Sequence, residues 1–415
     1  MKLYPHQTEA LELTKGFNRC AYYYDMGLGK TFIASEKADS FPEKILLICQ
    51  KSKIDDWIDH YRDNYNYTVF DLTNKKLLDE FVSVVGKCVG VINYDLAWRR
   101  SELSRLRGFT LILDESSMIQ NEHSKRAKFV LKMQPTNVIL LSGTPVSGKY
   151  EKLWSQLRLL GWNIKKRSYY NSYIITQWID IGGFQREVVR GYKNVEHLKM
   201  KLREYGAVFK KTEEVIDLPS QNIIPIRTKP TRDYKRFMKD DVVTVGENQF
   251  IGDTALTKRL YARMLCTYLN KARLTAFKDL LESTQDRLVV FYNFNAEKDV
   301  LVQIATENDR PVSVVNGEVR DLSAYENEDN SITLIQYQAG AMGLNLQKAN
   351  KVIYFSLTER SELFEQSKKR IHRIGQSKPC SYYVMYCPGT VEEHILETLR
   401  KRKDYTDALF KEYQH

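Results

Sequence analysis

Short apolar runs alternate with helix-like segments in two separate regions of the chain, and this alternation limits the fold more than any other feature. In the first region the runs are CAYYY, KILLIC, VGVIN, FTLILDE and NVILLSG. In the second region they are RLVVFYN, VSVVNG, ITLIQ, KVIYF and SYYVMY. Each run has the length of a buried strand, and strands separated by helical lengths form parallel sheets. The sequence therefore predicts an α/β protein with two parallel-sheet lobes.

Between about residues 150 and 276 the alternation fades and helical spacing predominates. The proline-containing stretch DLPSQNIIPIRTKPTRD predicts a crossing between the lobes. A basic amphipathic helix is expected from Val391 to about Tyr413. We therefore expect the following organisation: lobe one over 1–149, a helical insertion on lobe one over 150–218, a linker over 219–232, a helical segment over 233–275, and lobe two with its C-terminal helix over 276–415.

Composition narrows the class of partner and compartment. The chain has 63 Lys and Arg against 52 Asp and Glu, a net charge of +11, which favours a polyanion such as nucleic acid. Its six cysteines form no CxxC pair and lie mostly in apolar runs, so we expect buried, reduced thiols rather than a zinc site. The stretch MKLYPHQTEALEL has no apolar signal core, so export is not expected, and no apolar run approaches the ~18 residues of a membrane span, so membrane spanning is not expected either.

The stretch YYYDMGLGKTFIA carries a candidate phosphate-binding loop between a predicted strand and a predicted helix. The loop residues are Gly27, Leu28, Gly29, Lys30 and Thr31. Backbone N–H groups at a helix start bind phosphate oxygens, Lys30 can reach the β- and γ-phosphates, and the Thr31 hydroxyl can ligate Mg²⁺. Because Tyr24 occupies the first glycine position of the usual pattern, a chance glycine turn remains the alternative from this stretch alone.

Two carboxylates, Asp114 and Glu115, follow an apolar run at its carboxyl end. Asp114 can hold Mg²⁺, and Glu115 can act as the general base that polarises an attacking water. A helix cap uses the same residue types, but the glycine-lysine loop earlier in the chain favours the catalytic interpretation. After the next run, Ser142 and Thr144 form either a plain turn or a segment that senses the phosphate.

The order of these motifs resembles a helicase superfamily 2 motor of the Swi/Snf type. The stretches that carry the resemblance are LYPHQTEAL, DMGLGKT, LDESSMIQNEHSK, LLSGTP, GAMGLNLQKANKVIYF and QSKKRIHRIGQSK. It covers the chain from Leu3 to about Glu397 and implies two RecA-like lobes in tandem, with Gln7 reading the adenine edge. The family does not use the absent first glycine.

The chain also departs from this family. Ser117 stands where a DEAH or DEGH motif has histidine, and the stretch SLTERSELFEQ lacks the usual Trp-Asn-Pro. These changes leave Asp114 and Glu115 in place. We expect a compact form without accessory domains, of bacterial or phage origin.

The resemblance implies an ATP site split between the lobes. Lobe one would supply the phosphate-binding loop and the two carboxylates, and lobe two would supply Arg370 and Arg373. Three residues apart, these arginines would share a helix face, and their planar guanidinium groups suit phosphate oxygens. The alternative for this basic cluster is a solvated face. Gly343 would let the backbone approach the nucleotide closely.

Double-stranded or branched DNA is expected to lie across both lobes and to be held through its phosphate backbone. The candidate contacts, for each of which an ordinary loop role is the alternative, are Lys51, Ser52, Lys53, Asn93, Tyr94, Gln336, Asn345, Lys368 and Lys369. Asn345 suits either DNA or nucleotide, and Lys368 and Lys369 are expected to face solvent or DNA.

We therefore expect an ATP-driven, duplex-stimulated translocase that uses ATP and Mg²⁺ and works as a monomer on DNA. Two alternatives remain: a strand-separating helicase on DNA or RNA, and a non-catalytic nucleic-acid-binding scaffold. The expected compartment is the cytoplasm of a bacterium or phage-infected cell, or the nucleus if the source is eukaryotic.

Overall fold

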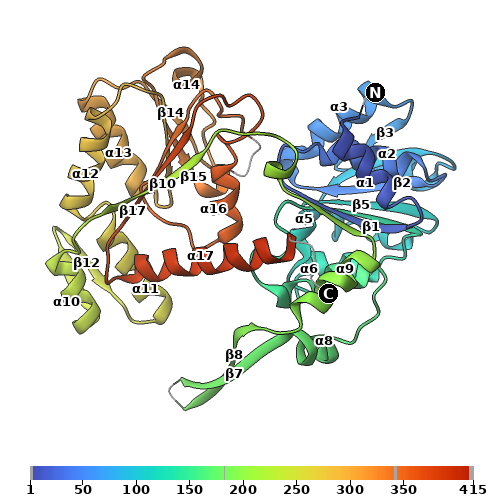
Figure 1. Cartoon of the computed structure of the whole chain (residues 1–415), viewed down its shortest axis with the longest axis horizontal. Coiled ribbons are helices and arrows are strands. Elements are labelled where there is room, and N and C mark those ends of the chain that lie inside the picture. The colour runs from blue at the N-terminus through green and yellow to red at the C-terminus, as the bar shows by residue number, and fades with distance from the viewer. Residues whose placement is uncertain (1–2, 182, 341–343, 411–415) are drawn as a thin grey trace. The chain divides into compact units, whose positions relative to one another are not determined.

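The computed structural model describes residues 3–181, 183–340 and 344–410. The chain divides into two compact units (Figure 1). Unit 1 comprises Met1–Ile216 and Lys403–His415, and unit 2 comprises Asp217–Arg402. Among the described residues, no helix is both long and apolar enough to cross a bilayer.

Unit 1 is built on a seven-stranded sheet in the order β3-β4-β2-β5-β6-β1-β9, in which all neighbouring strands are parallel. Its strands are β1 (Arg19–Tyr24), β2 (Lys44–Cys49), β3 (Thr68–Asp71), β4 (Cys88–Asn93), β5 (Phe109–Asp114), β6 (Asn137–Leu141) and β9 (Ala207–Lys210). Its helices are α1 (Pro5–Leu13), α2 (Lys30–Asp39), α3 (Ile54–Asn64), α4 (Lys75–Ser83), α5 (Tyr94–Ala97), α6 (Lys125–Lys132), α7 (Trp154–Leu159), α8 (Lys166–Tyr173) and α9 (Val195–Glu204). Short 3-10 turns are η1 (Lys51–Lys53), η2 (Ser101–Arg105), η3 (Ser116–Ile119), η4 (Tyr150–Lys152) and η5 (Thr212–Glu214).

Both faces of this sheet are buried, which explains why its strands read as continuous apolar runs. Successive side chains of a strand point to opposite faces. In β1, Tyr23 therefore joins one core cluster, whereas Tyr22 and Tyr24 join the cluster on the other face. All three tyrosines are fully buried, so this aromatic run packs the core and offers no ring to a nucleic-acid base.

Unit 2 is built on a six-stranded sheet in the order β10-β17-β16-β13-β15-β14, again with all neighbouring strands parallel. Its strands are β10 (Gln221–Arg227), β13 (Leu288–Tyr292), β14 (Val312–Val315), β15 (Ile332–Gln336), β16 (Lys351–Tyr354) and β17 (Cys380–Tyr386), with a separate antiparallel pair β11 (Val242–Val245) and β12 (Asn248–Ile251). Its helices are α10 (Arg232–Asp240), α11 (Ala255–Cys266), α12 (Lys271–Glu282), α13 (Asn295–Glu307), α14 (Ser323–Asn327), α15 (Tyr337–Gly340), α16 (Ser361–Lys368) and the start of α17 (Val391–Phe410).

The predicted fold class, two RecA-like parallel-sheet lobes in tandem, is confirmed, and each predicted apolar run contains a strand. The stretch expected to be a linker differs, because it contains β10, which pairs in parallel with β17. An edge strand tolerates Pro225, since one of its sides has no ladder partner. The finer boundaries within each lobe remain predictions.

The segment expected to be a helical insertion holds α7, α8 and α9 and also an antiparallel hairpin, β7 (Ile174–Ile181) with β8 (Phe184–Tyr192). In Figure 1 this hairpin extends away from the sheet of its own unit. The C-terminal helix α17 also differs from expectation, because its last turns belong to unit 1. There the Tyr150 hydroxyl donates to the Tyr405 carbonyl at 2.6 Å, and Leu409 is buried in the core.

Candidate active site

Three loops of unit 1 carry the predicted site residues, and they lie at one edge of the sheet. In the strand order, β6 pairs with β1 on one side and with β5 on the other. The loop after β1 leads into α2, the two carboxylates end β5, and Ser142 follows β6. Because parallel strands end at the same edge, these groups converge where open α/β sheets bind ligands.

Two glycines give the loop after β1 its shape. Gly27 and Gly29 have φ of +85° and +70°, values that favour glycine. Gly29 caps α2, so the backbone turns sharply before Lys30 and directs the start of the helix at the loop. Such a helix start is a ready site for phosphate oxygens.

Gln7 is packed against this loop. Its Nε2 atom donates to the carbonyls of Leu28 at 3.4 Å and Gly29 at 3.5 Å, and its Oε1 accepts from the Tyr4 backbone at 2.9 Å. A Cβ atom added at Gly29 would lie 2.1 Å from Gln7 Nε2. The loop therefore packs tightly against the side chain that the family resemblance associates with the adenine edge.

Lys30 brings a positive charge to the start of α2. Its Nζ atom donates to the carbonyls of Tyr24 at 2.7 Å and Asp25 at 3.0 Å. Thr31 follows in the first turn of the same helix. This part of unit 1 fits a nucleoside triphosphate with Mg²⁺, because it brings together an ammonium, a helix start, a hydroxyl and two nearby carboxylates.

The Glu115 carboxylate is held by two hydroxyls. Ser117 and Ser142 each donate to its Oε1 atom at 2.7 Å. Burial raises the pKa of Glu115, while these two hydrogen bonds and the Lys30 charge oppose the shift. A raised pKa suits a carboxylate that accepts a proton. Ser117, which stands where the resembling family has histidine, therefore acts on this carboxylate directly.

The backbone at Glu115 is also unusual. Its φ of 57° is left-handed, which is uncommon for a residue with a side chain. Such a conformation costs free energy and is found most often at functional sites.

Two aromatic side chains position the neighbouring carboxylate, and sequence patterns did not indicate either role. Trp57 Nε1 donates to Asp114 Oδ2 at 2.8 Å, and the Tyr94 hydroxyl donates to the Asp114 carbonyl at 3.0 Å. Tyr94 was expected to contact DNA. That expectation is wrong for its hydroxyl, because the side chain is buried beneath the carboxylates.

Gln156 connects strand β1 with the loops after β5 and β6 and was also missed. The hydroxyls of Tyr23 and Ser116 donate to its Oε1 atom at 2.9 and 2.8 Å, and its Nε2 atom donates to the Pro145 carbonyl at 2.7 Å. It is fully buried on α7. Its place on the apolar face of the expected helix, three residues after Leu153 and four before Leu160, is the signal that would have indicated it.

In unit 2, Arg370 and Arg373 lie in the turns that follow α16, which ends at Lys368. The expectation that the two arginines share a helix face is therefore wrong. The Arg370 carbonyl instead accepts from the Leu346 backbone at 3.0 Å, so a neighbouring loop replaces the next helical turn. Arg373 Nη1 donates to Asn345 Oδ1, which joins the turns after α16 to the loop that precedes β16.

The remaining candidates for DNA contact differ in their exposure to solvent and in whether their side chains already have a partner within the protein. Lys51 and Ser52 are exposed on η1, whereas Lys53 forms an ion pair with Asp56 at 2.6 Å. Gln336 donates to the Asn293 carbonyl at 3.1 Å, and Asn93 is partly exposed. These assignments and that of Lys369 stay predictions.

Lys368 was expected to face solvent or DNA; its side chain does not face solvent, and its contact with DNA stays a prediction. It is buried, its Nζ atom pairs with Glu365 Oε1 at 2.6 Å, and it lies over the Phe364 ring. Gly343 lies outside the described residues.

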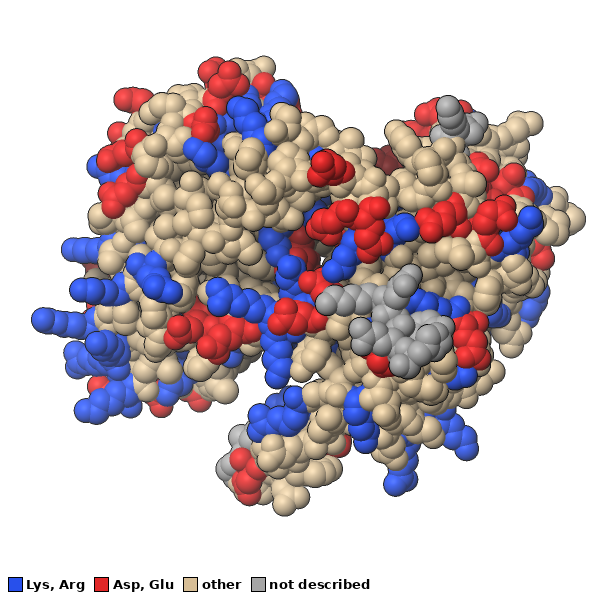
Figure 2. Space-filling model, viewed as in Figure 1, with Lys and Arg blue, Asp and Glu red and all other residues tan. Residues whose placement is uncertain are grey.

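An exposed basic ladder on α10 was not anticipated. Tyr234 and Phe237 are buried in a core cluster of unit 2. The exposed basic residues of the same helix are Arg232, Lys235, Arg236 and Lys239. Figure 2 shows Lys and Arg gathered over this region. In this short segment the buried aromatic residues and the exposed basic residues follow the spacing of two faces of one helix. The pattern can be recognised in the sequence once the segment is known to be helical.

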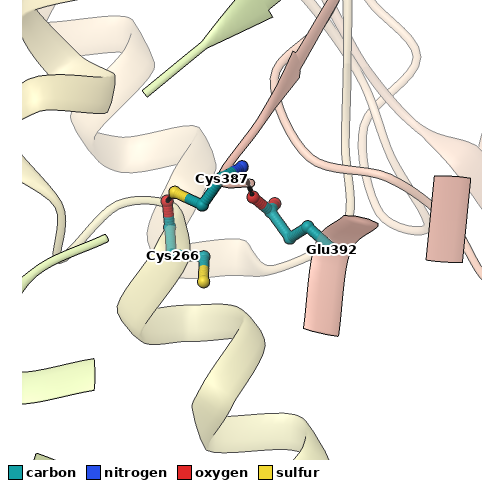
Figure 3. A group of neighbouring side chains, drawn as sticks. All are labelled: Cys266, Cys387 and Glu392. Carbon is teal, nitrogen blue, oxygen red and sulfur yellow. Dashed lines mark hydrogen bonds between the residues drawn. The ribbon is translucent and has the colours of Figure 1, made fainter. Parts of the chain in front are cut away.

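All six cysteines are buried, and two of them join a polar cluster in unit 2 (Figure 3). The ligand atoms of Cys266, Cys387 and Glu392 lie within 4.8 Å of one another. The Arg273 guanidinium binds the Glu392 carboxylate and donates to Cys387 Sγ at 3.6 Å. Because a fixed cation already neutralises this cluster, we assign it a structural role that joins α11, α12, β17 and α17 rather than a metal site.

Comparison with known proteins gives two family models that match the chain. The SNF2-related domain matches residues 11–272, and the helicase conserved C-terminal domain matches residues 272–375. The probable ATP-dependent DNA helicase CHR12 of Arabidopsis thaliana is 25% identical over 91% of this chain and 39% of its own length. The putative ATP-dependent helicase/translocase YwqA of Bacillus subtilis (strain 168) is 23% identical over 95% of this chain and 46% of its own length.

A solved structure, the Sulfolobus solfataricus SWI2/SNF2 ATPase core in complex with dsDNA, is 19% identical, with a TM-score of 0.45 over 98% of this chain and 92% of that chain. The chain spans less than half the length of the two curated relatives above.

Proposed function

The chain belongs to the SNF2-related family, and from that premise we propose that it is an ATP hydrolase stimulated by double-stranded DNA, along which it moves. The observation that carries the proposal is the convergence of Lys30, Asp114 and Glu115 at one edge of the unit 1 sheet. A phosphate-binding loop and a base within reach of one another are the minimum that hydrolysis of a triphosphate requires.

In this proposal each residue of unit 1 has one task. Lys30 and the start of α2 bind phosphate oxygens, and Gln7 recognises the adenine edge. Thr31 and Asp114 would hold Mg²⁺, which neutralises charge on the phosphoryl group that is transferred. Glu115 orients the attacking water and accepts its proton, and the two serine hydroxyls keep the carboxylate in position.

Arg370 and Arg373 of unit 2 complete the site in the proposal. A guanidinium directed at the transferring phosphoryl group stabilises charge that develops in the transition state, an effect on the order of 10³–10⁵ in rate. Because Arg373 Nη1 donates to Asn345, the orientation of the Arg373 guanidinium depends on the loop that precedes β16 and contains Asn345. Closure of the units on ATP and release after hydrolysis would then move DNA stepwise.

DNA contact in the proposal is made mainly to phosphates. Exposed groups that support this are Lys51 and Ser52 in unit 1 and the basic ladder of α10 in unit 2. Contacts of this kind are independent of sequence and weaken as salt increases. Lys235→Ala together with Lys239→Ala should lower affinity for duplex of any sequence and reduce the steepness of its salt dependence.

ATP hydrolysis measured with and without DNA tests the proposal. Linear duplex, fork, four-way junction, single strand and RNA should be compared. We expect stimulation by duplex and loss of hydrolysis in Lys30→Ala. Absence of stimulation by any duplex, or full activity in Lys30→Ala, would contradict the proposal. A strand-displacement assay separates duplex translocation from strand separation.

A further inference from the structure

The β7–β8 hairpin presents large apolar side chains to solvent at its distal end. Phe184 is 80% exposed and Trp178 is 62% exposed. The base of the hairpin is anchored, because the Tyr192 ring stacks on Tyr150 at 4.4 Å and its hydroxyl donates to Glu151 at 2.7 Å. An antiparallel pair of strands is only marginally stable alone, so this anchoring keeps the exposed end at a fixed place on unit 1.

The two faces of the hairpin differ in charge. Directly opposed residues share a face, and faces alternate along each strand. Arg186 lies two residues after Phe184 on β8, so these two side chains share one face. Ile179 of β7 is directly opposite Arg186. Trp178 is opposite Glu187 and lies on the other face.

A second guanidinium belongs to the first face. Gln177 lies two residues from Ile179 and therefore on the same side as Arg186. Arg190 Nε donates to Gln177 Oε1 at 2.8 Å. We call the surface formed by Phe184, Arg186, Gln177 and Arg190 the arginine face. Besides the exposed Phe184 ring at the tip and the two guanidinium groups, this face carries Ile179 and Val188.

We propose that the arginine face binds unpaired nucleotides where a DNA duplex branches, an inference that rests on the proposed function and specifies its substrate class. The Phe184 ring stacks on an unpaired base, and Arg186 and Arg190 bind the adjoining phosphates. Aromatic rings accept any base, so the contact does not depend on sequence.

Charge and shape favour nucleic acid over a protein partner on this face. The carboxylates of Asp180 and Glu187 lie with Trp178 on the opposite face, which directs a polyanion to the arginine face. A two-stranded ribbon is also thin enough to enter a nucleic-acid groove.

Binding of full-length protein to two fluorescent DNAs tests the inference. One is a linear duplex, and the other is a fork of the same duplex with two unpaired arms. Phe184→Leu keeps an apolar side chain but removes the ring, and Gln185→Ala changes an exposed neighbour on the opposite face. We expect the wild type to prefer the fork, Phe184→Leu to lose about 5- to 100-fold in fork affinity, and Gln185→Ala to bind both DNAs as the wild type does.

A direct readout uses 2-aminopurine at the first unpaired position of the fork. Stacking should quench its fluorescence in the wild type and in Phe184→Tyr but not in Phe184→Leu. Equal wild-type affinity for fork and duplex, or an unchanged fork preference in Phe184→Leu, would overturn the inference. Hydrolysis stimulated by linear duplex is measured in parallel, and its absence in the wild type would contradict the proposed function instead.

Discussion

Replacing Gly29 by alanine tests the geometry of the phosphate-binding loop. A residue with a side chain at a φ of +70° costs about 1–2 kcal/mol. The new Cβ would also lie 2.1 Å from Gln7 Nε2, so the amide must move away. The amide then loses three hydrogen bonds, two of which are long. We expect the loss of all three together to cost about 1–2 kcal/mol of stability. Gly29→Ala should therefore lower the free energy of unfolding by about 2–4 kcal/mol and weaken ATP binding.

A double-mutant cycle with Gln7→Ala separates the two effects. Once the amide is absent, alanine at Gly29 meets no clash and costs only the backbone strain. The two substitutions should therefore be non-additive by about 1–2 kcal/mol. Gly27→Ala is the matched control, because its φ is +85° but a Cβ there would meet nothing within 4 Å. It should cost only the backbone strain and should add to Gln7→Ala.

The measurement is urea unfolding followed by tryptophan fluorescence. All five tryptophans lie before residue 217, so this signal reports unit 1 alone. Strict additivity of Gly29→Ala and Gln7→Ala would refute the reasoning, since it would mean that the Gln7 amide does not occupy the space beside Gly29. Coupling of equal size for Gly27→Ala would also refute it.

Three further predictions follow from individual contacts. Ser142→Ala removes a hydrogen-bond donor that lowers the pKa of Glu115. The acid limb of the pH–rate profile for ATP hydrolysis should therefore move to higher pH. A limb that stays in place or moves to lower pH would contradict this. Trp57→Phe removes the donor to Asp114 and should raise the Mg²⁺ concentration for half-maximal hydrolysis about 10-fold, and an unchanged value would show that the indole does not position the carboxylate. Glu392→Gln leaves a buried guanidinium without its charge partner and should cost unit 2 about 3–5 kcal/mol by calorimetry, whereas a cost below about 1 kcal/mol would contradict the pairing.

Apart from the short edge strands β3 and β9 of unit 1, which no predicted run contains, the strands of both sheets were predictable because burial on two faces leaves continuous apolar runs such as KILLIC and ITLIQ. The edge strand β10 was not, because its pairing depends on β17, far along the chain, and its proline suggested a linker. The hairpin β7–β8 was missed for a related reason: both of its faces are exposed, so it lacks the alternation that marks a half-buried strand.

The site was predictable only where its residues adjoin in sequence. Lys30 and Thr31, or Asp114 and Glu115, form local motifs with a recognisable chemistry. Trp57 and Gln156 act on the same site through contacts that exist only after folding, so local spacing carries no sign of their partners. The helix expected around Arg370 and Arg373 does not form. The Arg370 carbonyl accepts a hydrogen bond from the distant Leu346 backbone instead of from the next turn of a helix.

The central proposal is that Arg370 and Arg373 take part in ATP hydrolysis, and duplex-stimulated ATP hydrolysis by Arg370→Ala and Arg373→Ala tests it most directly. Nucleotide binding and duplex binding should be measured on the same samples, with Lys369→Ala as the neighbouring control. We predict that each arginine variant loses hydrolysis by about 10³-fold or more while it still binds ATP and DNA, and that the control keeps its hydrolysis. Arginine variants that hydrolyse ATP normally and are only weakened in DNA binding would contradict the claim and would make this basic segment part of the DNA surface.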